Sequence, residues 1–107
     1  MTSPTGASEP RDVEELARLA DGVASAVIGC SGVAGLWQGP VATYLPHRTV
    51  PGVALRDGEV SVSVVARYGH RLTEVADEVR AAVRRAAPGR RVDVHIEDIE
   101  IPTVQEG

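Results

Sequence analysis

Three ionisable side chains alternate along one segment near the end of the chain, and they form the most chemically suggestive group in the sequence. Asp93, His95 and Glu97 are spaced two residues apart, so in a β-strand they lie on one face. Carboxylates on both sides of an imidazole can raise its pKa or help it to hold a metal ion. The same alternation is typical of the solvent-facing side of a half-buried strand. We favour this second interpretation, and an enzyme with His95 as a general base ranks last of three hypotheses.

The other residues of catalytic type do not form a recognisable motif. His47 and His70 are far apart, and neither has the spacing of a zinc ligand or lies next to Cys30. The chain contains no G-x-S-x-G motif. Gly32 and Gly35 follow a predicted helix and lack the G-x-G-x-x-G spacing of a phosphate-binding loop. The sequence therefore predicts a protein that is not an enzyme, with no catalytic residue, no metal and no cofactor.

The composition narrows the range of partners. The 107 residues include 15 acids, 11 arginines and no lysine, and the net charge is −4. This balance argues against a general binder of nucleic-acid phosphates. The only aromatic residues are Trp37, Tyr44 and Tyr68, so a pocket that stacks a flat cofactor is not expected. A small single-stranded nucleic-acid-binding domain that uses Arg67, Tyr68 and the arginines of the second helix is the second hypothesis.

No feature of the sequence indicates export or membrane insertion. The N-terminal residues lack a basic segment followed by an apolar one, and no apolar run approaches the ~18 residues of a membrane span. Cys30 is the single cysteine, so no disulfide can form within the chain, and a buried thiol is expected. We expect a cytoplasmic protein that reaches the inner face of the cell membrane only through a partner.

The strongest structural signal is a β-hairpin around Asp57-Gly58. This dipeptide favours a type I′ turn, in which both central residues have positive φ. The flanking residues alternate between apolar and small or polar types, which fixes the register because a slip by one residue would expose the valines. The expected cross-strand pairs are Arg56–Glu59, Leu55–Val60, Ala54–Ser61 and Val53–Val62.

Two amphipathic helices are predicted. One precedes the first strands in the chain, and the other lies between the hairpin and the last strand. The first begins at Asp12, which caps it, and Glu15 three residues later completes a capping box. The second begins at Thr73 and ends before Pro88-Gly89. In both segments the apolar residues recur every three or four positions, as they do on the buried side of a helix.

The last predicted strand, residues 92–101, changes phase near its end. Its apolar residues take even positions up to Ile96, whereas Ile99 and Ile101 take odd positions. This change implies either a β-bulge near Glu97-Asp98 or an apolar strip that contacts something outside the domain.

Together these elements predict an α+β domain with the order αβββαβ. Its small mixed sheet has three or four strands, both helices pack on one face, and the ring of Tyr68 closes the core before the second helix. Residues 12–101 form the domain, residues 1–11 and 102–107 are tails, and residues 37–51 are expected to be loops around a brief strand. The candidate interaction surface comprises Ser61, Ser63, Arg67, Asp93, His95, Glu97, Ile99 and Ile101.

Several short motifs occur in a specific order along the chain. They are Gly32-Val33-Ala34-Gly35-Leu36, Tyr68-Gly69, Leu72-Thr73-Glu74-Val75-Ala76, Val92-Asp93-Val94-His95-Ile96 and Asp98-Ile99. In this order, and over residues 12–101, the chain resembles the alkaline shock protein family of bacterial envelope stress response proteins, in a short actinobacterial-type form. Residues 37–51 depart from the family pattern.

The resemblance implies a non-enzymatic cytoplasmic protein that self-associates and is held at the membrane by a small anchoring protein. It implies no catalytic residues. The first hypothesis is therefore an interaction module of the envelope stress response. It would form a homo-oligomer or dock to a membrane-anchor protein through the open face of the sheet, Ile99 and Ile101.

Overall fold

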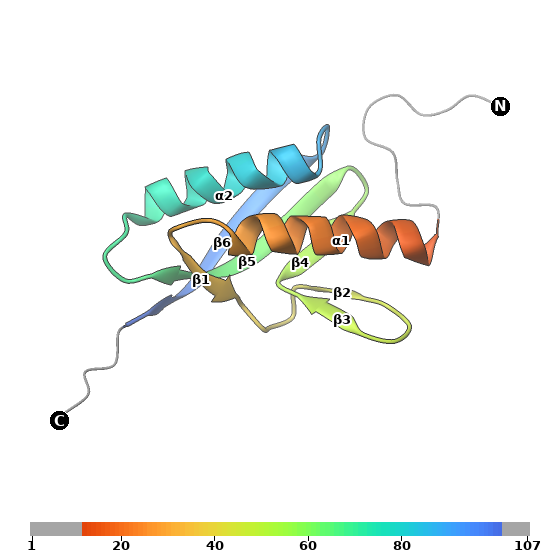
Figure 1. Ribbon diagram of the computed structural model, residues 1–107, viewed down its shortest axis with the longest axis horizontal. Coiled ribbons are helices and arrows are strands. Elements are labelled where there is room, and N and C mark those ends of the chain that lie inside the picture. Colours follow the sequence, from red (N-terminus) through yellow and green to blue (C-terminus); the bar gives the residue numbers. More distant parts are fainter. Residues whose placement is uncertain (1–11, 102–107) are drawn as a thin grey trace.

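The computed structural model describes residues 12–101, and the tails expected at 1–11 and 102–107 lie outside this range. Figure 1 shows the arrangement of its helices and strands. In chain order the elements are α1 (Val13–Ile28), β1 (Val33–Leu36), β2 (Ala42–Tyr44), β3 (Thr49–Pro51), β4 (Val53–Arg56), β5 (Glu59–Arg67), α2 (Leu72–Ala86) and β6 (Arg91–Glu100).

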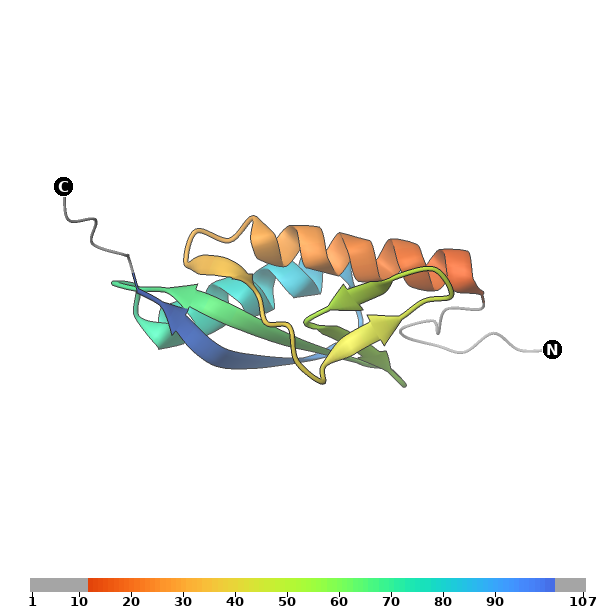
Figure 2. The same ribbon diagram turned by 90° about the horizontal axis from the view of Figure 1, so that it is seen from below.

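The central strand of the main sheet is β5. Its neighbours β4 and β1 pair with it in antiparallel orientation, and β6 pairs with it in parallel. The parallel connection runs through α2, because parallel neighbours need a crossover. Both helices lie on the same face of this mixed sheet (Figure 2). The predicted α+β class and the order of its main elements are confirmed.

The hairpin of β4 and β5 has the predicted register but a different turn. Arg56 pairs with Glu59 and Val53 with Val62, as expected from the alternation. Within residues 12–101 only glycines have positive φ, and Gly58 has a φ of 66°. Asp57 therefore has negative φ, so the predicted type I′ turn is wrong. A negative and then a positive φ are the signs of a type II turn, which needs glycine only at the second position.

Residues 37–51 contain more regular structure than the sequence indicates. β2 was expected as a brief strand, but β3 was not, and the two form a separate antiparallel hairpin. The buried hydroxyl of Thr43 donates to the carbonyl oxygen of Val53 at 2.6 Å, which ties this hairpin to β4. Its loop is held to α1 by two hydrogen bonds from Arg48 to the carboxylate of Asp21, at 2.9 and 2.6 Å. These hydrogen bonds lower the pKa of the Asp21 carboxyl.

The change of phase in β6 is a β-bulge. Val64 pairs with Ile96 and Val65 pairs with Asp98, so Glu97 is the additional residue. Past the bulge Ile99 pairs with Ala66, which is fully buried, and Ile99 thus returns to the helix-facing side of the sheet. Of the two explanations that the sequence offered for the change of phase, the β-bulge near Glu97-Asp98 is therefore confirmed.

The core consists almost entirely of valine and alanine side chains. Val60, Val62 and Val64 of β5 are fully buried in one cluster with Val23 of α1 and Val79 of α2. Tyr68 does not close this core, contrary to the prediction, because its side chain is 64% exposed.

The turn between α1 and β1 is fixed to α2 by Glu78. The Glu78 carboxylate accepts hydrogen bonds from the backbone N–H groups of Ser31 and Gly32, at 2.9 and 3.1 Å, and from the Ser31 hydroxyl at 3.1 Å. No sequence pattern singled out this residue among the charges of α2. It joins two elements that lie 46 residues apart in the chain.

The thiol of Cys30 is buried beside this turn and is expected to react slowly. Burial is the main cause that raises its pKa, and the nearby Glu78 carboxylate adds to the effect. Because the thiolate is the reactive form, labelling of the native protein by a disulfide reagent at pH 8 should be at least roughly tenfold slower than labelling in denaturant. Equal rates would show that the thiol is accessible in the folded state.

Candidate interaction surface

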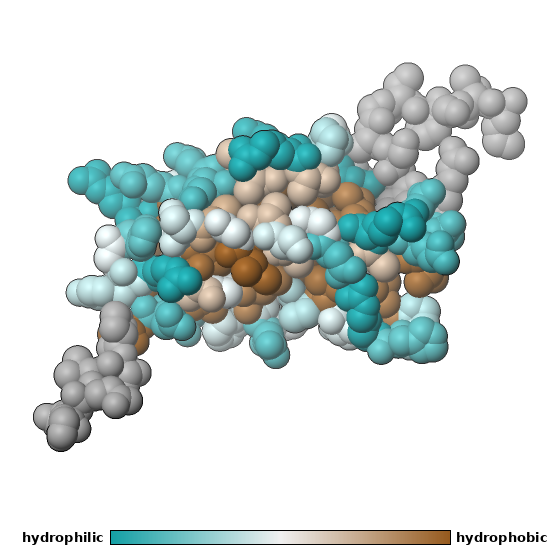
Figure 3. All heavy atoms as spheres, viewed as in Figure 1, coloured by the Kyte–Doolittle hydropathy of each residue, from teal (hydrophilic) through white to brown (hydrophobic). Residues whose placement is uncertain are grey.

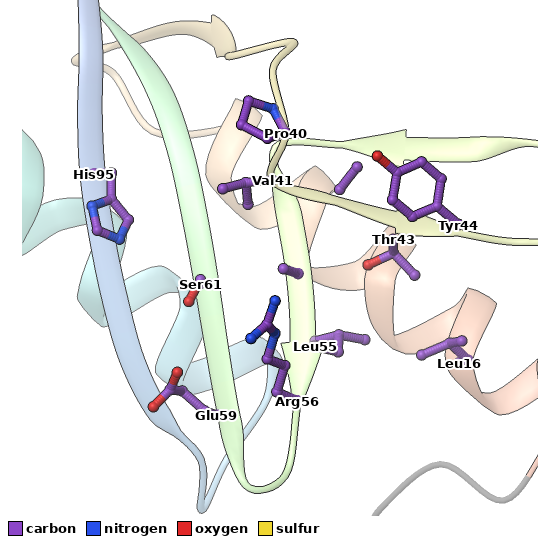
Figure 4. A pocket seen from close by; sticks show the side chains of 12 residues that line it. Leu16, Pro40, Val41, Thr43, Tyr44, Leu55, Arg56, Glu59, Ser61 and His95 are labelled. Carbon is purple, nitrogen blue, oxygen red and sulfur yellow. The ribbon is translucent and has the colours of Figure 1, made fainter.

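A hollow of about 580 Å³ lies at the β4 edge of the main sheet, where it extends from the open face to Leu16 of α1. Ser61 of β5 and His95 of β6 lie on its sheet side, and Tyr44 of β2 lies on the side of the small hairpin. Figure 4 shows His95 and Tyr44 at opposite ends of this hollow, with Arg56 between them. The hollow exists because the β2–β3 hairpin leaves the plane of the main sheet at its β4 edge.

Asp93, His95 and Glu97 lie on one face of β6, as predicted, but they form two separate contacts and not one cluster. His95 Nε2 lies 3.0 Å from Asp93 Oδ2, and the Ser63 hydroxyl lies 3.5 Å from Glu97 Oε2. Within residues 12–101 no hydrogen bond joins Ser61 to His95, so no nucleophile–base pair is formed there. No cluster of three or more possible metal ligands occurs within the same range. The arrangement supplies a polar, charged surface with a histidine–carboxylate contact.

The exposure of the predicted surface residues differs along the face. Arg67, Asp93, His95 and Glu97 are exposed, as expected for a solvent-facing side, and Ser61 is half-buried. Ser63 is fully buried, so its predicted place on an accessible surface is wrong. Its backbone bonds to the N–H of Trp37 and to the carbonyl of Gly52, and its short side chain lies beside Glu97.

Sequence analysis missed two residues that line the hollow. Arg56 ends β4 and supplies a positive charge, and Tyr44 supplies an exposed aromatic ring. The predicted pairing of Arg56 with Glu59 and of Ala54 with Ser61 already implies that the Arg56 side chain lies on the open face, because Arg56 and Ala54 are two residues apart on one strand. For Tyr44 the sequence holds no local signal, because its position depends on how the small hairpin leaves the sheet.

Four large apolar side chains are exposed at the end of the sheet where β6 finishes. Ile99 is 39% exposed and Ile101 is 69% exposed, near Tyr68 and Leu72, which are 64% and 43% exposed. The Tyr68 N–H donates to the Glu100 carbonyl oxygen at 3.1 Å, which brings the corner before α2 next to the end of β6. We call these four residues the terminal apolar patch. Single exposed apolar residues are common, whereas these four are exposed together at one end of a small domain.

A second hollow of about 470 Å³ lies between α1 and the strands β1 and β3. Ile28, Leu36 and Val50 line it, together with the Asp21–Arg48 ion pair. Figure 3 shows hydrophobic atoms gathered below α1 on this side of the molecule. Ile28 is 58% exposed here, far along the chain from the terminal apolar patch.

The positive charges named for nucleic-acid binding are not gathered together. Arg67 lies at the end of β5, before α2 begins, whereas Arg84 and Arg85 lie in the last turn of α2. The two groups are therefore separated by most of the length of the helix. A binder of single-stranded nucleic acid combines a continuous positive groove with stacked aromatic rings. Arg80, which lies between these two groups, is paired with Asp77 at 3.3 Å, and Arg71 lies 3.9 Å from Glu74.

Comparisons with protein-family models, with curated proteins and with solved structures give no match for this chain. In the described part of the chain, neither helix is both long and apolar enough to cross a membrane.

Proposed function

We propose that the protein is a non-enzymatic interaction module that docks to other proteins, including copies of itself, through the terminal apolar patch. The observation that carries this proposal is the joint exposure of Tyr68, Leu72, Ile99 and Ile101 at one end of the domain. Burying such side chains against a partner is favourable by about 1.5–3 kcal/mol for each large apolar residue. The neighbouring open face, with its charged residues, provides a polar rim of the kind that surrounds apolar contact surfaces.

The resemblance to alkaline shock proteins extends this proposal to a cellular role. On that basis, the partner is a small membrane-anchor protein, and the module acts at the cytoplasmic side of the membrane during envelope stress. This extension rests on the resemblance alone.

Changing Ile99 and Ile101 together to aspartate tests the proposal. We expect the variant to remain folded, because both side chains are already partly exposed. Sedimentation velocity should show at least roughly tenfold weaker self-association, since charges replace two apolar contacts. The same variant should be lost from the membrane fraction of the cells that make the native protein.

Ile28→Asp is the matched control, because Ile28 is exposed but lies outside the terminal apolar patch. It should associate and fractionate like the native chain. Unchanged association and unchanged membrane recovery of the double variant would refute the proposed use of the patch.

A further inference from the structure

One long edge of the main sheet is unpaired in the part of the chain that the structure describes. β6 bonds only to β5, and its other side has no neighbouring strand within residues 12–101. The Arg91 N–H donates to the Gly58 carbonyl at 2.8 Å, so Arg91 points its backbone groups toward β5. Because these groups alternate along a strand, Val92, Val94 and Ile96 point their N–H and C=O groups away from the sheet. Such a row is a template for another strand.

The side chains along this edge are also incompletely covered. Val92, Val94 and Ile96 are half-buried, although they face the helix side of the sheet. Their partners on β5, namely Val60, Val62 and Val64, are fully buried. The core thus covers the central strand completely and the β6 edge, beneath α2, only in part. A strand added beside β6 would bring further apolar side chains next to these three.

The sequence of β6 is complementary to itself in one antiparallel register. If Val94 pairs with Val94 of a second copy, Val92 faces Ile96 on the helix side. On the open face Arg91 then faces Glu97, and Asp93 faces His95. Every cross-strand pair is therefore apolar with apolar, or joins an acid to a basic residue.

The neighbouring registers lack this complementarity. A seam centred on Asp93 places Asp93 opposite its own copy, and a seam centred on His95 places Asp93 opposite Glu97. Like charges directly opposite each other on a sheet are destabilising. The Val94-centred register also uses the strand up to Glu97, where the bulge interrupts the regular edge. Its outward-pointing residues lie opposite one another, as interchain hydrogen bonds require.

The helix layer is compatible with the same two-fold axis. An axis through Val94, perpendicular to the sheet, places α2 antiparallel to its copy on the same face. The first half of α2 carries Glu74 and Asp77, and its last turn carries Arg84 and Arg85. The acidic half of each helix is therefore directed toward the basic end of the other.

We propose that a second copy of this chain pairs with the β6 edge in this register, which forms one continuous sheet across a two-fold dimer. This inference goes beyond the proposed function, because it names a second contact surface and the partner that covers it. The seam, residues 91–97, precedes the bulge, whereas Ile99 and Ile101 follow it, so the two surfaces can be altered separately.

Charge exchange within the full chain tests the seam. Arg91→Glu places an acid opposite Glu97 twice in each dimer, and it also removes the exposed 3.7 Å ion pair of Arg91 with Glu59 within the monomer. Glu97→Arg places a base opposite Arg91 twice in each dimer and leaves that ion pair in place. Each single variant should weaken the dimer at least roughly tenfold in sedimentation equilibrium, because two opposite-charge pairs become like-charge pairs. The combined Arg91→Glu, Glu97→Arg variant restores opposite charges, and its dissociation constant should return to within roughly threefold of the native value. Arg18→Glu, an equal change of charge at an exposed residue of α1 outside the seam, should leave dimerisation unchanged.

Val94→Pro provides a second test that does not depend on charge. Proline is tolerated on an edge strand where the N–H faces outward, so the monomer should keep its fold by circular dichroism while the dimer is lost. A dimer that survives this change would overturn the proposed seam, and so would a double charge variant that dimerises no more tightly than the single variants.

Loss of association in the Ile99→Asp, Ile101→Asp variant alone would support the terminal apolar patch and refute the seam. Loss of association in the seam variants alone would support the seam and refute self-association through the patch. A native chain that stays monomeric at millimolar concentration would refute the seam and would also refute self-association through the terminal apolar patch.

Discussion

Gly52→Ala is expected to destabilise the protein by about 2–4 kcal/mol, from backbone strain and overpacking together. Gly52 has a φ of 79°, which an alanine adopts only with strain. A Cβ atom there would also lie 2.8 Å from Leu36 Cβ and 2.9 Å from the carbonyl oxygen of Ser63. The Ser63 oxygen belongs to the backbone of β5, so it cannot move aside without disturbing the sheet. Chemical denaturation with urea, monitored by circular dichroism, measures the loss.

Alanine substitutions at two other glycines separate the backbone strain from the overpacking in the destabilisation expected for Gly52→Ala. Gly58 has a φ of 66°, but a Cβ atom there would have no neighbouring atom within 4 Å, so Gly58→Ala should cost only the backbone strain, about 1 kcal/mol. Gly22 lies inside α1 with open space around it, and Gly22→Ala should stabilise by roughly 0.5–1 kcal/mol. Equal effects at Gly52 and Gly58 would show that the close contact at Gly52 does not matter.

Glu78→Ala is expected to cost about 1–3 kcal/mol at pH 7, because it leaves two backbone N–H groups and a hydroxyl without their charged acceptor. Thermal unfolding followed by circular dichroism gives the difference. Glu74→Ala is the matched control, since Glu74 lies on the same helix with only a long, exposed contact to Arg71 at 3.9 Å. It should change stability by less than roughly 0.5 kcal/mol.

The same carboxylate predicts a loss of stability in acid. Hydrogen bonding from the Ser31 N–H is the main cause that lowers the pKa of Glu78 below its ordinary value of 4.5. A carboxyl with a lowered folded-state pKa contributes its full stability above the unfolded-state pKa, and loses it as the pH falls through the folded-state value. The stability difference between the native chain and Glu78→Ala should therefore be constant near neutral pH and shrink below about pH 4.5. A difference that stays the same down to about pH 2 would contradict the assigned role.

The parts of the fold that were predictable are those governed by alternation within a few residues. The register of β4 with β5 follows from the apolar pattern on both sides of Asp57-Gly58, and it is confirmed. β3 has only three residues and ends in Pro51, so it carries too short a pattern to identify. The buried hydrogen bond from Thr43 to Val53, which fixes its hairpin, is a long-range contact that no local period records.

The candidate surface was predictable to the level of which residues share a face. Asp93, His95 and Glu97 were assigned to the open face by their spacing, and all three are accessible to solvent there. The burial of Ser63 depends on neighbours that come from two other segments of the chain. The exposure of Leu72 could not be anticipated either, because its helical period puts it on the buried stripe while the sheet ends beneath it. Periodicity states which way a side chain points, but only the packing determines what covers it.

The position of β5 in the centre of the sheet has a consequence during synthesis on the ribosome. β5 leaves the ribosome before β6, which is the last strand of the sheet to be made. At about 5–20 residues per second, the side of β5 that later holds β6 remains without its neighbour for a period on the order of seconds. During that time the nascent chain exposes a valine-rich strand edge, and protection by a chaperone or by the emerging α2 would be most valuable then.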